Sequence, residues 1–259
     1  MEELLVATGD TSLEVHRYAS SGPLVCLLPG LGGGIRRFAD LGRRLADAGT
    51  QPVAINPRGA GASTGDLNEL RLGDLANDVA EVVEHFGPPA IVVGNAYGNR
   101  IARALATDRP ALVTAVVLVC AGGEVRPDRE AGLALREFLD ESRTEAERLD
   151  AARRALFAPG HEVDPSFIDP GRSIEAATAQ MAAMRAEPTD DWLAGGSAPM
   201  LVVQGVEDRI APPENGHRLR ARWPDRVEVV DVADAAHAIL NEQPDAVAAA
   251  ILDFVARRT

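Results

Sequence analysis

The chain has 259 residues, of which 46% are hydrophobic and 25% are charged, proportions that exclude disorder as its main state. Its formal net charge of −13 disfavours contact with phosphate backbones and anionic lipid, so no nucleic-acid or membrane partner is expected. Residues 1–8 lack the layout of a signal peptide, and the longest apolar run, residues 111–121, is too short to span a bilayer. These features predict a soluble, cytoplasmic protein.

Short apolar runs alternate with amphipathic segments along most of the chain. An opening hairpin is predicted over residues 4–7 and 13–18, and runs typical of buried strands follow at residues 23–28, 52–55, 90–93, 113–120, 200–203 and 227–230. Apolar residues at helical spacing predict helices over residues 37–48, 72–86, 99–107, 215–222 and 245–257. Repeated strand-then-helix units predict an α/β fold: a mostly parallel sheet of about eight strands with helices on both faces.

Residues 123–196 interrupt this alternation because they contain no run typical of a buried strand. Helices are expected here over residues 128–139, 144–157 and 173–186. An insertion of this size between two strands predicts a helical layer over the carboxyl ends of the sheet. The predicted domains are therefore a core of residues 1–122 and 197–259 and an inserted helical cap of residues 123–196.

A glycine-flanked turn, Gly94-Asn95-Ala96-Tyr97-Gly98, joins the strand predicted at residues 90–93 to the helix that follows it. Such a tight turn forces strained backbone angles on its middle residue, and flanking glycines relieve the crowding. With serine in the middle, this turn would present a catalytic nucleophile. Here the frame is present and the hydroxyl is missing, because the middle residue is Ala96.

Two further residues follow later strands on loops where chemistry is expected. Asp208 comes after the strand at residues 200–203, and His237 comes after the last strand. In open α/β sheets, ligands bind at the carboxyl ends of the strands, so both side chains are candidates for one site. The remaining histidines have no such setting and are interpreted as surface residues: His16, His85, His161 and His217.

The order of turn, acid and histidine resembles that of the α/β-hydrolase superfamily, and the likeness covers essentially the whole chain. Residues 29–34, PGLGGG, resemble the family's oxyanion loop, with Pro-Gly in place of the usual His-Gly. Residues 56–63, NPRGAGAS, resemble its D-x-R-G-x-G-x-S turn, with Asn56 in place of Asp. The three main signals are the turn around Ala96, Asp208 and His237. Each is weak alone, but together they agree with the superfamily in order and position.

This resemblance implies roles for particular residues. Asp208 would be the acid, His237 the base, and Ala96 would occupy the nucleophile position. The backbone N–H groups of Leu31 and Tyr97 would form the oxyanion hole. No metal or cofactor is predicted, since the chain lacks a P-loop lysine, a dinucleotide-binding glycine pattern and a cluster of metal-ligating residues.

Three interpretations of Ala96 remain open. The chain is an engineered serine-to-alanine form of an esterase- or lactonase-type hydrolase, or an enzyme with a native alanine, or a non-catalytic small-molecule binding protein on the same scaffold. We favour the second, because an Asp-oriented histidine with backbone oxyanion donors still suits general-base chemistry. Water activation is one such reaction, and the cofactor-free lyases, oxygenases and cyclases of this fold are others.

The expected substrate or ligand is a small neutral or weakly polar carbonyl compound. Candidate contact residues are the polar neighbours of Ala96 and the large apolar residues of the inserted segment, which at helical spacing are equally typical of its own core. They are Asn95, Tyr97, Asn99, Phe138, Phe157, Met181, Met184 and Trp192.

Overall fold

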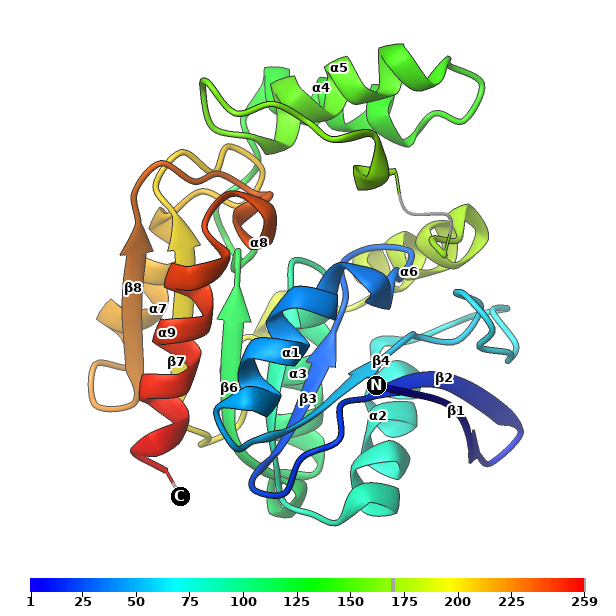
Figure 1. Ribbon diagram of the computed structural model, residues 1–259, viewed down its shortest axis with the longest axis vertical. Coiled ribbons are helices and arrows are strands. Elements are labelled where there is room, and N and C mark those ends of the chain that lie inside the picture. The colour runs from blue at the N-terminus through cyan, green and yellow to red at the C-terminus, as the bar shows by residue number, and fades with distance from the viewer. Residues whose placement is uncertain (169–170, 259) are drawn as a thin grey trace.

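The protein is built around one open sheet with helices on both faces, as the computed structural model of residues 1–168 and 171–258 shows (Figure 1). In these residues the sheet has eight strands, in the order β1-β2-β4-β3-β5-β6-β7-β8. Their bounds are β1 (Glu2–Thr8), β2 (Thr11–Arg17), β3 (Leu24–Leu28), β4 (Gln51–Ile55), β5 (Ala90–Asn95), β6 (Val113–Val119), β7 (Met200–Gly205) and β8 (Val227–Val232).

Strand β2 pairs antiparallel with β1 and with β4, and the remaining pairs are parallel. The predicted α/β fold with a mostly parallel sheet is therefore confirmed. One detail is corrected: residues 227–230 were expected to form a strand buried on both faces, but β8 has only one neighbour in the sheet and exposes Glu228, Val230 and Asp231.

The short helix α8 was not predicted, and the other helices follow the predicted segments to within about two residues at each end. Their bounds are α1 (Ala39–Asp47), α2 (Leu72–Phe86), α3 (Gly98–Asp108), α4 (Arg129–Leu139), α5 (Glu145–Leu156), α6 (Ile174–Ala186), α7 (Glu214–Arg222), α8 (Ile239–Glu242) and α9 (Pro244–Ala256). Side chains of α1 and α9 share one apolar core with the sheet, and those of α2 and α3 share the core on the opposite face. Within the described residues, no helix is long and apolar enough to span a membrane.

The inserted segment contains α4, α5 and α6. Figure 1 shows α4 and α5 beyond the tips of the strand arrows, which mark the carboxyl ends of β6, β7 and β8. These two helices pack on each other and share a small apolar cluster that includes Phe138 and Phe167, whereas α6 contacts α2. The layer above the strand ends is thus formed by α4 and α5, and the domain limits at residues 123 and 196 stay a prediction.

Candidate active site

Ala96 lies in the turn between β5 and α3 with a φ of 49°, in the left-handed region that is costly for a residue with a Cβ. Both flanking glycines are required by close backbone contact. A Cβ on Gly94 would lie 2.4 Å from the Gly98 carbonyl, and a Cβ on Gly98 would lie 2.4 Å from the Leu28 carbonyl oxygen. The strained, glycine-flanked turn expected from the sequence is therefore present around Ala96.

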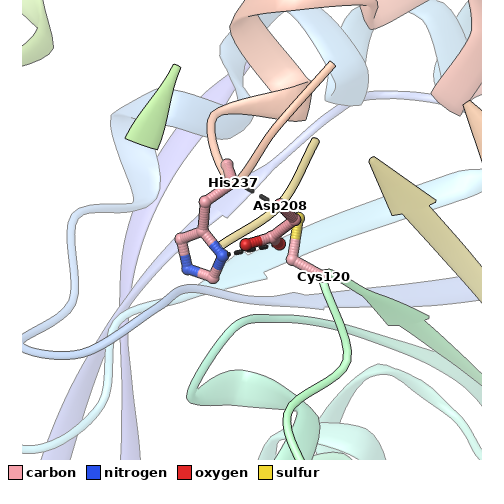
Figure 2. Close-up of side chains that lie close together, drawn as sticks. All are labelled: Cys120, Asp208 and His237. Atoms are coloured by element: carbon pink, nitrogen blue, oxygen red, sulfur yellow. Dashed lines mark hydrogen bonds and ion pairs between the residues drawn. The ribbon is translucent and has the colours of Figure 1, made fainter. Parts of the chain in front are cut away.

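Asp208 and His237 are in direct contact: the imidazole Nδ1 lies 2.9 Å from the Asp208 Oδ2 (Figure 2). The carboxylate is fully buried and is fixed by further donors. Its Oδ1 accepts hydrogen bonds from the backbone N–H groups of Ile210 and Ala211, at 2.9 and 2.7 Å, and its Oδ2 accepts one from Gln204 Nε2 at 3.3 Å. A carboxylate held in this way keeps the proton on Nδ1 and leaves Nε2 as the basic nitrogen.

The other carboxylate near this loop, Asp234, is engaged elsewhere. Its Oδ1 lies 3.1 Å from His161 Nε2, so it does not compete with Asp208 for His237. One expectation about the remaining histidines is wrong. His16 is buried at 3% exposure in β2, where its Nε2 lies within 3.6 Å of the carboxylates of Glu3 and Glu14.

A cavity of about 110 Å³ opens beside His237, and Ala96 is part of its wall. Backbone of the loop after β3 and apolar side chains from α4 and α5 form much of the remainder. The lining residues are Gly30, Leu31, Gly33, Arg37, Asn95, Ala96, Leu135, Phe138, Leu139, Leu156, Phe167, Arg172, His237 and Ala238. Residues from four separate parts of the chain thus meet around one small space.

The backbone N–H groups of Leu31 and Tyr97 have no hydrogen-bond acceptor in the described part of the chain. Leu31 lines the cavity, and Tyr97 directly follows Ala96 of its wall. The neighbouring donors are used, since Gly32 N–H binds Gln180 Oε1 at 2.8 Å and Gly33 N–H binds the Gly30 carbonyl at 3.1 Å. Backbone donors left open next to a cavity are the arrangement that binds a carbonyl oxygen.

Asn56 holds the loop that carries Leu31. Its Oδ1 accepts hydrogen bonds from Gly34 and Ile35 N–H at 3.0 and 3.2 Å, and its Nδ2 donates to Glu14 Oε2 at 2.8 Å. The amide serves both sides because it accepts and donates. An aspartate here would place a second carboxylate against Glu14, which gives a physical reason for Asn in place of the family's Asp.

The structure brings only some of the predicted contact residues to the cavity. Asn95 and Phe138 line it. The Tyr97 phenol instead donates to the Gln180 carbonyl at 3.2 Å, and burial raises its pKa. The Asn99 Nδ2 donates to two carbonyls of the segment that follows β6, both at 2.9 Å. These two side chains form hydrogen bonds within the protein and are not part of the described cavity lining.

The remaining candidates also lie away from the cavity wall that the described residues form. Trp192 is 2% exposed and packs between the guanidinium groups of Arg100 and Arg103, at 4.4 and 4.6 Å from the ring centroid. Met184 packs against the main core, and Met181 is not part of the lining. Phe157 lines a separate groove to which α4 and α5 both contribute. The core interpretation of these side chains is the one that the packing supports.

Sequence reasoning missed three polar residues beside the dyad. Arg37 and Arg172 line the cavity, but neither belongs to a motif or a periodic pattern that would have identified it. Cys120 is a buried free thiol directly after β6, and its Sγ lies 3.5 Å from the His237 carbonyl oxygen and close to Asp208 (Figure 2). Its position behind the dyad depends on the pairing of β6 with β7, which no local signal reveals.

Cys120, Asp208 and His237 form the one group in the described residues whose ligand atoms are close enough to hold a metal ion, within 4.8 Å of one another. Their surroundings do not suit one. Burial and the neighbouring Asp208 raise the pKa of the Cys120 thiol, and both oxygens of Asp208 already accept hydrogen bonds. The arrangement favours a neutral thiol packed against the dyad.

The fold, the strained turn after β5 and the histidine–aspartate contact at the strand ends define an α/β-hydrolase, as the sequence resemblance predicted. The family model described as serine aminopeptidase, S33, matches residues 20–244. The chain therefore belongs to this family of hydrolases.

Individual relatives agree with this assignment. The chain is 30% identical over 257 residues to the "Putative carbamate hydrolase RutD" of Variovorax paradoxus (strain S110), covering 94% of this chain and 95% of that protein. The fold matches that of an esterase from Exiguobacterium antarcticum with a TM-score of 0.82 at 18% identity, over 97% and 98% of the two chains. It also matches a bromoperoxidase-type protein, BpoC of Mycobacterium tuberculosis H37Rv, with a TM-score of 0.81 at 24% identity, over 95% and 96%.

Proposed function

We propose that this hydrolase-family enzyme acts on a small carbonyl compound by general-base catalysis, without a covalent serine intermediate. The observation that carries the proposal is the buried His237–Asp208 contact in a cavity whose wall also holds Ala96. The base and the carboxylate that orients it are complete, while the position of the attacking hydroxyl holds only a methyl group.

The chemistry follows from these groups. The substrate carbonyl oxygen accepts hydrogen bonds from the N–H groups of Leu31 and Tyr97, which stabilise the negative charge that develops on it. His237 Nε2 removes a proton from a water molecule while the water oxygen attacks the carbonyl carbon. The resulting imidazolium, stabilised by Asp208, then returns that proton to the leaving group as the bond to carbon breaks. The ring nitrogen is neutral again at the end of the cycle.

Hydrolysis is favoured over the other reactions open to such a base, since the chain belongs to a family of hydrolases and a relative is named a putative carbamate hydrolase. The same base could also remove a proton from the carbon next to a carbonyl. Lyase, oxygenase or cyclase chemistry of that kind has no separate support from the contacts in the cavity.

The deciding experiment compares the native chain with Ala96→Ser on p-nitrophenyl acetate and on a panel of small esters, lactones and carbamates. We expect slow turnover by the native chain with no burst phase and no acyl adduct in its mass spectrum, since it has no hydroxyl at the turn. The serine variant should show weak esterase activity at best. Activity on the preferred compound should survive Ala96→Ser and collapse in His237→Ala.

Two outcomes would contradict this proposal and support the alternatives. A gain approaching about a million-fold in Ala96→Ser, with a trapped acyl-enzyme and dependence on His237, would identify a serine hydrolase that lacks only its nucleophile. No turnover of any compound by either form, together with ligand binding that is unchanged in His237→Ala, would identify a binding protein.

A further inference from the structure

Two arginines form part of the wall of the cavity that holds Ala96 and His237. Arg172 Nε donates to the Leu31 carbonyl at 3.0 Å, which ties its side chain to the loop that carries a proposed oxyanion donor. Its guanidinium carbon lies 5.8 Å from the Phe138 ring centroid, and that of Arg37 lies 5.8 Å from the Phe167 centroid. Contacts of this kind with aromatic rings stabilise a guanidinium in place.

The two rings are themselves neighbours, with centroids 5.7 Å apart. The aromatic pair therefore links the two cations into one wall of the cavity. This wall includes residues from the loop before α1, from α4 and from the segment before α6, so it exists only in the folded chain. Both arginine side chains are half-buried in it.

Arg37 and Arg172 are the only arginines in the described lining, which contains no aspartate or glutamate. Both side chains also interact with other groups of the protein, so the inference rests on their place and chemistry and not on their being unpaired. A guanidinium has five N–H donors and can serve several acceptors at once. Among the described residues, the cavity wall therefore contains two cationic side chains, in a chain whose net charge is −13.

We propose that the substrate carries a carboxylate in addition to its reactive carbonyl, and that Arg37 and Arg172 bind this carboxylate. The proposal rests on the proposed function and names its substrate class. It replaces the neutral substrate expected from the sequence, because the cavity wall contains two cations that the sequence did not identify.

The size of the cavity limits this substrate. A volume of about 110 Å³ lies well below the roughly 300–1,000 Å³ of pockets that bind drug-sized ligands. The substrate is therefore a small molecule in which the carboxylate and the reacting carbonyl are only a few atoms apart. Binding of its carboxylate by arginine also fixes the direction of the carbonyl, since the fork of a guanidinium matches the two oxygens of a carboxylate.

The test measures binding, which requires no turnover. Isothermal titration calorimetry with malonate and with its neutral analogue malonamide is carried out on the native chain, Arg37→Gln and Arg172→Gln. A third variant, Arg36→Gln, is the matched control because Arg36 is the exposed neighbour of Arg37 and does not line the cavity. Melting curves establish that each variant is folded, and Arg172→Lys tests whether charge alone is sufficient.

We expect malonate to bind the native chain and the Arg36→Gln variant equally, and malonamide to bind neither measurably. Each of Arg37→Gln and Arg172→Gln should weaken malonate binding by about tenfold to a hundredfold, as expected when a charge-assisted hydrogen bond is lost. Arg172→Lys should recover only part of the affinity, because an ammonium lacks the fork.

Equal binding of malonate and malonamide, or malonate affinity that is unchanged in both cavity variants, would overturn the proposal. Failure of the proposed function gives a different result. In that case malonate binds and depends on both arginines, while monoethyl malonate is not hydrolysed in a His237-dependent manner.

Discussion

The turn that carries Ala96 has as well defined a backbone as the loops that carry Asp208 and His237. Only the two loops present side chains that can take part in acid–base chemistry. The Asp208 carboxylate accepts four hydrogen bonds, and the Ala238 N–H next to His237 donates to the Leu156 carbonyl at 2.7 Å. The turn after β5 keeps two sterically required glycines and a left-handed residue, and presents a methyl group. The frame of the turn is therefore complete, although its middle residue has no hydroxyl.

A strained backbone costs about 1–3 kcal/mol per residue, so its retention calls for a reason. Besides the side chain at its centre, the turn also presents a backbone donor. The Tyr97 N–H has no protein acceptor in the described residues and directly follows Ala96 of the cavity wall. If that N–H binds the substrate carbonyl, the strained angle at Ala96 remains useful without serine. The turn would thus have two functions, to present a reactive side chain at residue 96 and to present the Tyr97 N–H. Only the second is possible with alanine at its centre.

The largest effect is expected for His237→Ala, which removes the proposed base. Turnover of the preferred compound should fall by about a hundredfold to ten-thousandfold, the usual contribution of a positioned general base. Steady-state kinetics measures the fall in kcat/KM. His217→Ala is the matched control, since His217 lies on α7 with its side chain 50% exposed and should change kcat/KM by less than twofold. Equal activity of the two variants would contradict the assignment of His237.

The second effect concerns the loop that carries Leu31. Asn56→Asp places a carboxylate where Asn56 Nδ2 now donates to Glu14 Oε2, and the two carboxylates repel each other. We expect a loss of about 1–3 kcal/mol in the free energy of unfolding, measured by urea denaturation, and lower activity. The double variant Asn56→Asp/Glu14→Gln should recover most of both, because the glutamine amide can donate to the new carboxylate. Equal losses in the single and double variants would show that repulsion by Glu14 is not the cause.

The contacts behind these two predictions, His237 with Asp208 and Asn56 with Glu14, differ in whether the sequence alone could predict them. The pairing of His237 with Asp208 was expected from chain order and from their positions after parallel strands, because the carboxyl ends of such strands meet at one edge. The contact of Asn56 with Glu14 joins residues that are 42 positions apart, one directly after β4 and the other on β2. Only the register of β2 against β4 brings them together, and no local pattern encodes that register.

The difference between local patterns and long-range contacts also explains which other sequence predictions were right and which were wrong. Helix α2 begins and ends at the predicted residues, since its apolar stripe is a local property of the sequence. Large apolar residues of the inserted segment could not be divided between cavity and core, because Phe138 and Trp192 have the same chemistry and differ only in what packs against them. Arg37 and Arg172 were missed for that reason too.

A smaller effect is expected for Glu242→Gln, which tests how the histidine loop is held. The Glu242 carboxylate accepts hydrogen bonds from the Ala158 and Ala236 N–H groups, at 2.6 and 2.8 Å, and so joins the end of α5 to the loop of His237. Glutamine has only one acceptor oxygen. We expect kcat/KM to fall by about fivefold to tenfold, as for a lost hydrogen bond. Glu187→Gln is the control, since Glu187 also accepts a backbone N–H, that of Leu72, far from this loop.

This substitution also has a pH signature. Burial raises the pKa of Glu242 above its ordinary value of 4.5, so ionisation of this group costs the folded state stability as pH rises through that pKa. The native chain should therefore lose stability relative to Glu242→Gln as pH rises above about 4.5. Unfolding measured in urea between pH 4 and 8 tests the sign. A stability difference that stays constant over this range would contradict the burial argument.

The smallest effect on activity is expected for Tyr97→Phe, and its size separates the two functions assigned to residue 97. The phenol donates to the Gln180 carbonyl on α6 at 3.2 Å, and Tyr97 is not part of the described cavity lining. The backbone N–H is the group that we propose as a donor to the substrate carbonyl. Phenylalanine removes the first and leaves the second. The free energy of unfolding should fall by about 1 kcal/mol, the typical net value of a buried hydrogen bond, while kcat/KM stays within about twofold.

Tyr18→Phe is the matched control, because Tyr18 is equally buried and its phenol also donates to a backbone carbonyl, that of Phe38 at 3.4 Å. If Tyr97→Phe lowered kcat/KM tenfold or more while Tyr18→Phe did not, the phenol would take part in binding or chemistry. The turn would then contribute a side chain as well as an N–H group, and the contrast between a complete dyad and a turn without a reactive side chain would no longer hold.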